Sequence, residues 1–201
     1  MKRNFRIPNL GGASAIILHR PHGVVASIAR QLEAIGVTRI ECWPELGADA
    51  VAADFVFFDV DLGHDEQFPW QPGEAPMPLI ALIGSEAPGR IEWALNHNAD
   101  AHLLKPVGNA GVYSALLIAR RAFDARKQLD SEIHALGERV AARQTIVRAV
   151  AILEERGLDD EQAYAQLRAL AMSWQMNMED AARRVVAWAH DGGRNDQSDI
   201  A

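Results

Sequence analysis

Cysteine is almost missing from this sequence of 201 residues, in which Cys42 is the only one. A single thiol cannot form an intrachain disulfide, so the chain is not a disulfide-stabilised secreted scaffold. Long hydrophobic runs are also missing, because no apolar segment approaches the ~20 residues that a membrane-spanning helix needs. These two absences predict a soluble protein of the reducing cytoplasm.

An excess of positive charge is missing as well. The formal net charge is −7; residues 1–118 carry 8 basic and 13 acidic side chains, and residues 119–201 carry 12 and 14. A nucleic-acid-binding protein usually presents a basic body to the phosphates. Neither half is basic, so any binding to nucleic acid must depend on a local group of cations.

Catalytic and metal-binding motifs form the fourth absence. The histidines have no metal-ligand spacing, the glycine pairs at 11–12 and 192–193 lack the surroundings of a phosphate-binding loop, and no Ser-His-Asp or Cys-His set can be assembled. We therefore expect no enzymatic activity, no cofactor and no metal site.

The first half contains an alternation of strand-like and helix-like segments. Apolar runs typical of strands occupy residues 14–18, 38–43, 54–59, 77–84 and 101–106. Helical spacing separates several of them, at 24–36 and 88–98, and another helix begins near Gly108. This order predicts the α/β class, with a doubly wound five-stranded parallel sheet. The proline-rich segment 64–78 stands where a crossover helix belongs, and we expect a loop or a shortened helix there.

From about residue 115 the pattern changes to one long helix. Its seam alternates spacings of four and three residues: Ala115, Ala119, Ala122, Arg126, Leu129, Ile133, Leu136, Val140, Arg143, Val147 and Val150. Such heptads are typical of coiled coils. We predict a homodimer held by the uninterrupted part of the seam, namely Leu129, Ile133, Leu136 and Val140. The alternative is a helix that packs on its own domain.

The remaining residues predict a compact helical unit. A first helix over 145–157 ends at Gly157, Asp159 and Gln162 resemble a capping box for a second helix over 160–174, and a third covers 178–190. The chain then divides into a flexible leader at 1–13, an α/β domain at 14–118, a coiled-coil dimerisation helix at 119–144, a three-helix unit at 145–190 and a disordered tail at 191–201.

Several stretches resemble known families. The strand order and LLKP at 103–106 are similar to a receiver (flavodoxin-like) domain of response regulators, and AYAQLRALAM at 163–172 with DAARRVV at 180–186 resembles the ANTAR module. Their order, with CWP at 42–44, resembles AmiR-like antitermination regulators of the ANTAR family. The resemblance implies binding to stem-loop leader RNA and a ligand-sensing regulatory protein that sequesters the chain.

The resemblance to a receiver also says which residues phosphorylation would need. A working receiver has an acid pair after its first strand to hold Mg²⁺, an acceptor aspartate after the third and a lysine after the fifth. Asp59 and Lys105 match, but His19 and Arg20 replace the acid pair. We interpret Asp59 as a phosphoacceptor relic that Lys105 and Arg20 keep ionised, which makes the domain a pseudo-receiver. The alternative is a phosphorylated response regulator that uses Asp59.

Three further positions bear on the same chemistry. Ile83 stands where a receiver has a hydroxyl, although Ser85 follows two residues later, and His102 stands at the usual aromatic switch position. Asp61 could add one metal ligand, but a single extra acid does not replace the pair after the first strand.

The resemblance to ANTAR implies the RNA-binding residues: Arg148, Tyr164, Arg168, Arg183 and Arg184. Unpaired bases stack on aromatic rings and arginine planes, and phosphates meet cations. Tyr164 also abuts an apolar stripe and could belong to the core, while Arg168 and Arg183 could be solvated faces of helices. A tail that has lost the basic residues of the family would leave a regulator that binds only proteins.

Overall fold

The computed structural model describes residues 10–195, and side chains up to Ala189. The chain divides into two compact units, Met1–Gln128 and Leu129–Ala201. The leader predicted at 1–13 lies mostly outside the described residues, as does the end of the predicted tail, 196–201. None of the described helices combines the length and hydrophobicity that crossing a bilayer requires.

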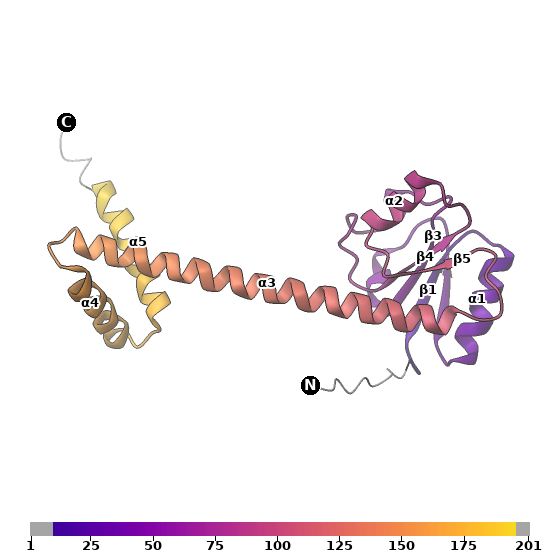
Figure 1. The fold of residues 1–201 in the computed structure, drawn as a ribbon, viewed down its shortest axis with the longest axis horizontal. Coiled ribbons are helices and arrows are strands. Elements are labelled where there is room, and N and C mark those ends of the chain that lie inside the picture. Colours follow the sequence, from indigo (N-terminus) through magenta and orange to yellow (C-terminus); the bar gives the residue numbers. More distant parts are fainter. Residues whose placement is uncertain (1–9, 196–201) are drawn as a thin grey trace. The chain divides into compact units, whose positions relative to one another are not determined.

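The first unit is built on a five-stranded sheet (Figure 1). Its strands are β1 (Ser14–Leu18), β2 (Thr38–Cys42), β3 (Phe55–Asp59), β4 (Leu79–Ile83) and β5 (Ala101–Leu104). They lie in the order β2-β1-β3-β4-β5, and every neighbouring pair is parallel. The predicted α/β class and doubly wound sheet are therefore confirmed.

Burial along the strands explains this order. Every residue of β3 and β4 is buried, as expected for strands whose apolar runs face helices or loops on both sides. In β2, four of the five residues are exposed, which fits its place at the edge of the sheet. Because the strands are parallel, the carboxyl ends of β1, β3, β4 and β5 lie at the same edge of the sheet. The site described below lies at that edge.

Helices cover the two faces of the sheet unequally. Helix α1 (Gly23–Ala34) and the start of α3 (Val112–Glu154) pack on one face, and α2 (Pro88–Asn96) packs on the other (Figure 1). The predicted proline-rich loop contains only a three-residue 3₁₀ turn, η2 (Asp65–Gln67). A second 3₁₀ turn, η1 (Ala48–Ala52), connects β2 to β3.

Aromatic side chains fill the space that a crossover helix would occupy. Phe68, from the proline-rich segment, packs edge-on against Phe58 of β3 at 5.6 Å and lies 5.7 Å from Trp70, measured between ring centroids. Trp93 of α2 contacts the same group at 5.7 Å from Phe58. Large rings can bury this face without a regular helix, because each buries more area than an aliphatic side chain.

The second unit contains the end of α3 together with α4 (Asp160–Ser173) and α5 (Met178–Asn195). Its core is apolar: Ala149, Val150, Leu153, Ala163, Leu167, Ala171, Ala181, Ala182 and Val185. The capping box is present, because Asp159 accepts from the Gln162 amide at 2.8 Å and the Gln162 side chain accepts from the Asp159 amide at 3.3 Å. Asn177 caps α5 in the same way, accepting from the Asp180 amide at 2.7 Å.

Two helix boundaries differ from those expected. The long helix and the first helix of the three-helix unit form one element, α3, with no break near residue 145. Helix α5 continues past Gly192 and Gly193 to Asn195, five residues into the segment that we expected to be disordered. Glycine weakens a helix interior by about 1 kcal/mol relative to alanine, which lowers helix stability without forbidding the conformation.

Candidate functional site: a pre-filled anion pocket

Loops at the carboxyl edge of the sheet bring a group of charged residues together. Asp59 is the last residue of β3 and is buried, with 1% of its surface exposed. Lys105 follows β5, and its ammonium donates to the Asp59 carboxylate at 2.7 Å. The parallel register that pairs Asp59 with Leu82 of β4 makes this approach possible. The structure thus brings together the two residues that match a receiver.

Asp61 occupies the space beside this pair. Its carboxylate lies 2.5 Å from the Lys105 ammonium and accepts from the backbone amides of Gly84 at 2.9 Å and Ser85 at 2.8 Å. A Cβ atom on residue 84 would lie 2.5 Å from the Asp61 carboxylate, so only glycine permits the approach. Asp61 is therefore held in an anion pocket made of one ammonium and two amides.

Electrostatics favour the charged forms of both partners. Partial burial alone would raise the pKa of Asp61, but hydrogen bonds from Lys105, Ser85 and Gly84 lower it below its ordinary value of 3.8. Burial alone would lower the pKa of Lys105, but hydrogen bonds to Asp59 and Asp61 raise it above 10.5. The Lys105 ammonium and the Asp61 carboxylate therefore stay charged beside one another across the neutral pH range.

His19 lies on the other side of Asp59. Its Nδ1 is 2.6 Å from the Arg20 carbonyl, which can only accept, so Nδ1 carries a proton. Its Nε2 is 3.4 Å from the Asp59 carboxylate and has no hydrogen-bond partner. The ring is buried, and it fills the position after β1 where a receiver has its metal-binding acids.

The prediction that Arg20 keeps Asp59 ionised is corrected by this geometry. The Arg20 side chain is exposed, and within residues 10–195 its guanidinium forms no ion pair with Asp59. The buried His19 ring lies beside the Asp59 carboxylate instead, with its Nε2 at 3.4 Å. Arg20 contributes only its backbone carbonyl, which accepts from His19. Besides Lys105, the donors of the pocket are the backbone amides of Gly84 and Ser85, which donate to the Asp61 carboxylate.

Of the other positions compared with a receiver, only Ser85 takes part in the pocket, and it does so through its backbone. Ile83 is buried in the core, Ser85 contributes its backbone amide, and His102 is exposed on β5. Across the described part of the chain, no group of three or more His, Cys, Asp or Glu side chains is arranged to hold a metal ion.

The second unit presents most of the predicted RNA-binding residues at its surface. Arg148 and Arg168 are exposed, and the described residues offer them no carboxylate within ion-pair distance. Tyr164 is 49% exposed, so the alternative that it belongs to the core is wrong. Arg183 is engaged locally, because it pairs with Asp180 at 2.5 Å on the same face of α5.

Arginine and tryptophan pair twice in this unit. The Arg184 guanidinium lies 4.6 Å from the ring centroid of Trp174, and that of Arg156 lies 4.8 Å from Trp188. Our sequence comparison missed both tryptophans as candidate site residues. The available signal is the four-residue spacing of Arg184 and Trp188, which puts both on one face of a helix.

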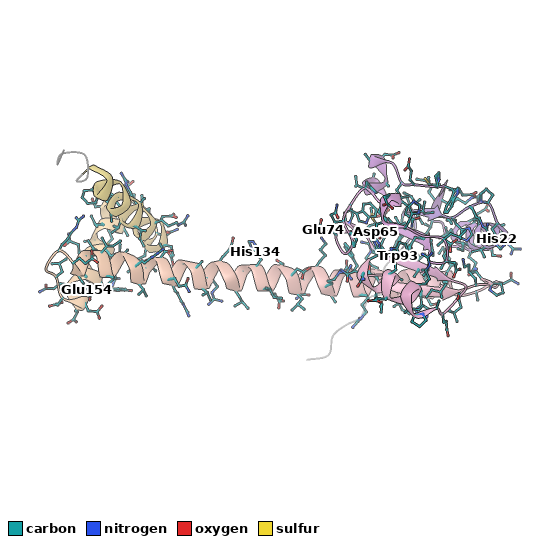
Figure 2. All side chains as sticks on the ribbon, turned by 90° about the horizontal axis from the view of Figure 1, so that it is seen from above. His22, Asp65, Glu74, Trp93, His134 and Glu154 are labelled. Carbon is teal, nitrogen blue, oxygen red and sulfur yellow. The ribbon has the colours of Figure 1, made fainter. Side chains whose placement is uncertain are left out.

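The predicted dimerisation residues form an exposed apolar line along α3. The exposed fractions are 56% for Leu129, 60% for Ile133, 56% for Leu136 and 54% for Val140. Figure 2 draws the side chains along this part of α3, around the labelled His134. The alternative that the seam packs on its own domain therefore does not hold for these four residues.

The fold and the pocket together define a class of protein: a regulator with a receiver-like domain joined through a long helix to a helical output unit. The profile of the family "AmiR, N-terminal" matches residues 13–120, and that of the ANTAR domain matches residues 134–186. The chain belongs to the AmiR N-terminal family. Carrying both domains, it is an AmiR-like regulator of the RNA-binding antitermination class.

Solved structures of receiver domains are similar to the first part of the chain. The first receiver domain of ShkA, in complex with c-di-GMP, is 24% identical, with 55% of this chain and 95% of that chain covered and a TM-score of 0.43. A receiver domain from Desulfovibrio desulfuricans G20 is 18% identical over 58% and 97%, with a TM-score of 0.43. A Thermotoga maritima response regulator is 17% identical over 51% and 92%, with a TM-score of 0.41. A search of curated proteins found no match.

Proposed function

We propose that this chain is an antitermination regulator whose pseudo-receiver domain works without phosphorylation. It binds stem-loop leader RNA through its ANTAR unit, acts as a homodimer, and is controlled by a ligand-sensing protein that sequesters it. The observation that carries the proposal is the Asp61 carboxylate in the anion pocket beside Asp59.

The pocket opposes phosphorylation for two physical reasons. A phosphoryl group on Asp59 would need anion donors, and the Lys105 ammonium and the amides of Gly84 and Ser85 are already engaged by Asp61. Phosphoryl transfer to a carboxylate also gathers negative charge that a cation must neutralise. His19 stands where the metal-binding acids of a receiver would be, so the residues for that neutralisation are missing.

Local charge supports RNA binding despite the acidic total. Arg148 and Arg168 are exposed with no carboxylate partner in the described chain, and exposed Tyr164 stands one helical turn from Arg168. Cations that meet phosphates release counterions, and rings accept stacked bases. These side chains supply both kinds of contact.

The seam of α3 supports the homodimer. An exposed line of leucine, isoleucine and valine at heptad spacing is stabilised when it meets the same line of a second helix. Two chains would present two ANTAR units to two RNA loops, which raises the apparent affinity without new contacts.

The closed pocket supports control by a partner. A domain that is not switched by a phosphoryl group still presents a folded surface, and a second protein that binds it can withhold the regulator from RNA. The ligand-sensing character of that protein is what the resemblance to AmiR-like regulators implies.

The test is fluorescence anisotropy of the purified full chain with a leader RNA of two stem-loops, at low and at moderate salt. We expect binding that weakens steeply with salt, a protein dimer per RNA and no change after incubation with acetyl phosphate. Uptake of phosphate at Asp59, detected by mass spectrometry, would establish the phosphorylated response regulator instead. A chain that binds no RNA would be the regulator that binds only proteins.

A further inference from the structure

Four side chains in the second unit alternate between tryptophan and arginine. Arg184 stacks on Trp174 at the end of α4, Arg156 stacks on Trp188 of α5, and Arg184 and Trp188 are neighbours one turn apart on α5. We call Trp174, Arg184, Trp188 and Arg156 the Trp–Arg ladder. It joins three helices, because Arg156 follows the end of α3, which Figure 2 marks at Glu154.

Of the ladder, only Trp174 packs against the core of the unit, where it is half-buried. Trp188 is 61% exposed, and Arg156 and Arg184 are exposed too. The described residues give neither arginine a carboxylate within ion-pair distance. A large exposed ring beside an unpaired cation leaves apolar surface and charge uncompensated, which is typical of a surface that meets another molecule.

Similarity to the ANTAR domain covers only part of the ladder. The match includes Arg156, Trp174 and Arg184 and ends at residue 186, two residues before Trp188. The contact between Arg156 and Trp188 therefore depends on this chain's own continuation of α5, which runs on to Asn195.

We propose that the Trp–Arg ladder binds unpaired bases of an RNA loop, a proposal that rests on the RNA-binding function proposed above. A guanidinium lies over the Trp188 ring, and the high exposure of the ring leaves area on which a base can stack. The same guanidinium would then meet the phosphate of that nucleotide. Stacking on aromatic rings and arginine planes is how proteins hold unpaired bases.

Charge favours RNA over a protein partner. The ladder itself carries two cations and no carboxylate. Of the acids on α5, Glu179 and Asp180 lie in its first turn, with Asp180 occupied by Arg183, and Asp191 follows Trp188 by three residues. Alternating rings and cations match a strand that alternates bases and phosphates. An acidic peptide would satisfy the arginines but would leave the exposed ring of Trp188 without a partner.

The test uses the full chain and an RNA that it selects itself from a library of hairpins with randomised loops. The variants are Trp188→Ala and Trp188→Phe, with Tyr113→Ala as the matched control, because Tyr113 is an exposed aromatic residue of the first unit. We expect Trp188→Ala to raise the Kd roughly 5- to 100-fold, as loss of one base stack does. Trp188→Phe should raise it less, and Tyr113→Ala should leave it unchanged.

Two further readouts separate stacking from charge and from misfolding. The dependence of the Kd on salt should keep its slope in Trp188→Ala, because no phosphate contact of an arginine is removed. An abasic site in the selected loop should weaken binding to the native chain and leave binding to Trp188→Ala unchanged. Circular dichroism should be the same for all variants, since Trp188 lies at the surface.

Each outcome decides the proposal. An unchanged Kd for Trp188→Ala on the selected RNA would overturn the ladder as a base-binding site and leave the proposed function intact. Selection of no RNA by the full chain would overturn the proposed function and the ladder together. Unchanged RNA affinity with a protein complex lost in Trp188→Ala would assign the ladder to a protein partner and overturn the inference.

Discussion

At the scale of single residues, one carboxylate takes the place of a ligand. Asp61 receives an ammonium and two backbone amides, the kind of donors that hold phosphate groups in proteins. It reaches them because Gly84 has no side chain at the point of closest approach. The anion that fills the pocket is thus tethered to the chain itself.

Removing that carboxylate should open the pocket. We expect Asp61→Ala to bind inorganic phosphate, because the Lys105 ammonium and the amides of Gly84 and Ser85 lose their partner. Nuclear magnetic resonance should record phosphate-dependent shifts of both amides in the variant only. Glu66→Ala, which removes an exposed acid from the same loop region and changes the charge equally, is the control. Equal shifts in the native chain would contradict a pre-filled pocket.

The same carboxylate should give a pH-dependent contribution to stability. The pKa of Asp61 in the folded chain lies below its ordinary 3.8, so the folded state favours the charged form. Its contribution is therefore present above pH 3.8 and disappears as the pH falls through the lower, folded value. We expect Asp61→Asn to lower the free energy of unfolding by about 1–2 kcal/mol at pH 7.

The pH profile supplies the control for that measurement. Denaturant unfolding of the native chain and of Asp61→Asn should give stabilities that begin to converge below pH 3.8 and meet once the pH has fallen below the lower pKa of the folded carboxylate. A difference that persists undiminished at low pH would show that the substitution acts through packing and not through charge.

Sequence alone predicted part of this pocket. Asp59 and Lys105 were identified because each follows a recognisable strand, and strand ends of a parallel sheet share an edge. Asp61 was interpreted only as a weak metal ligand, since the amides that it accepts from belong to a loop 23 residues away along the chain. Arg20 was placed wrongly because no pattern states which of two adjacent side chains turns inward.

At the scale of secondary structure, local signals predicted the helices and strands but not where two predicted helices form one continuous helix. The capping box of Asp159 and Gln162 depends on residues three apart, so spacing was sufficient to find it. The continuity of α3 past residue 145 has no such signal, because nothing in the sequence marks the absence of a boundary. The aromatic packing of Phe58, Phe68 and Trp93 depends on contacts across the fold, which periodicity does not report.

The exposed seam of α3 gives a prediction at the same scale. We expect Leu136→Asp to make a dimeric chain monomeric, because two carboxylates would be buried together at the pairing surface. Analytical ultracentrifugation or light scattering measures the mass in solution. Ser131→Asp adds the same charge on the opposite side of the helix and should leave the dimer intact. A native chain that is itself monomeric would remove the seam as a dimer contact.

At the scale of the whole molecule, RNA affinity should depend on a few arginines of the second unit. We expect Arg168→Glu to weaken RNA binding by more than ~1 kcal/mol and to reduce the salt slope by about 1, as loss of a phosphate contact does. Arg30→Glu, on α1 of the first unit, changes the net charge equally and is the matched control. If both variants bind RNA like the native chain, Arg168 is a solvated residue.

The carboxylate held in the pocket also bears on how long a regulatory response lasts. An acyl phosphate hydrolyses, so a phosphorylated aspartate carries a built-in lifetime, and the signal fades as the bond breaks. Asp61 is held by hydrogen bonds and by its own backbone, at a concentration fixed by the fold, with no bond to make or break. A domain of this kind has no hydrolytic lifetime that could limit its signal. Under the function proposed above, the duration of a response would depend on how long the regulator stays apart from a protein that sequesters it.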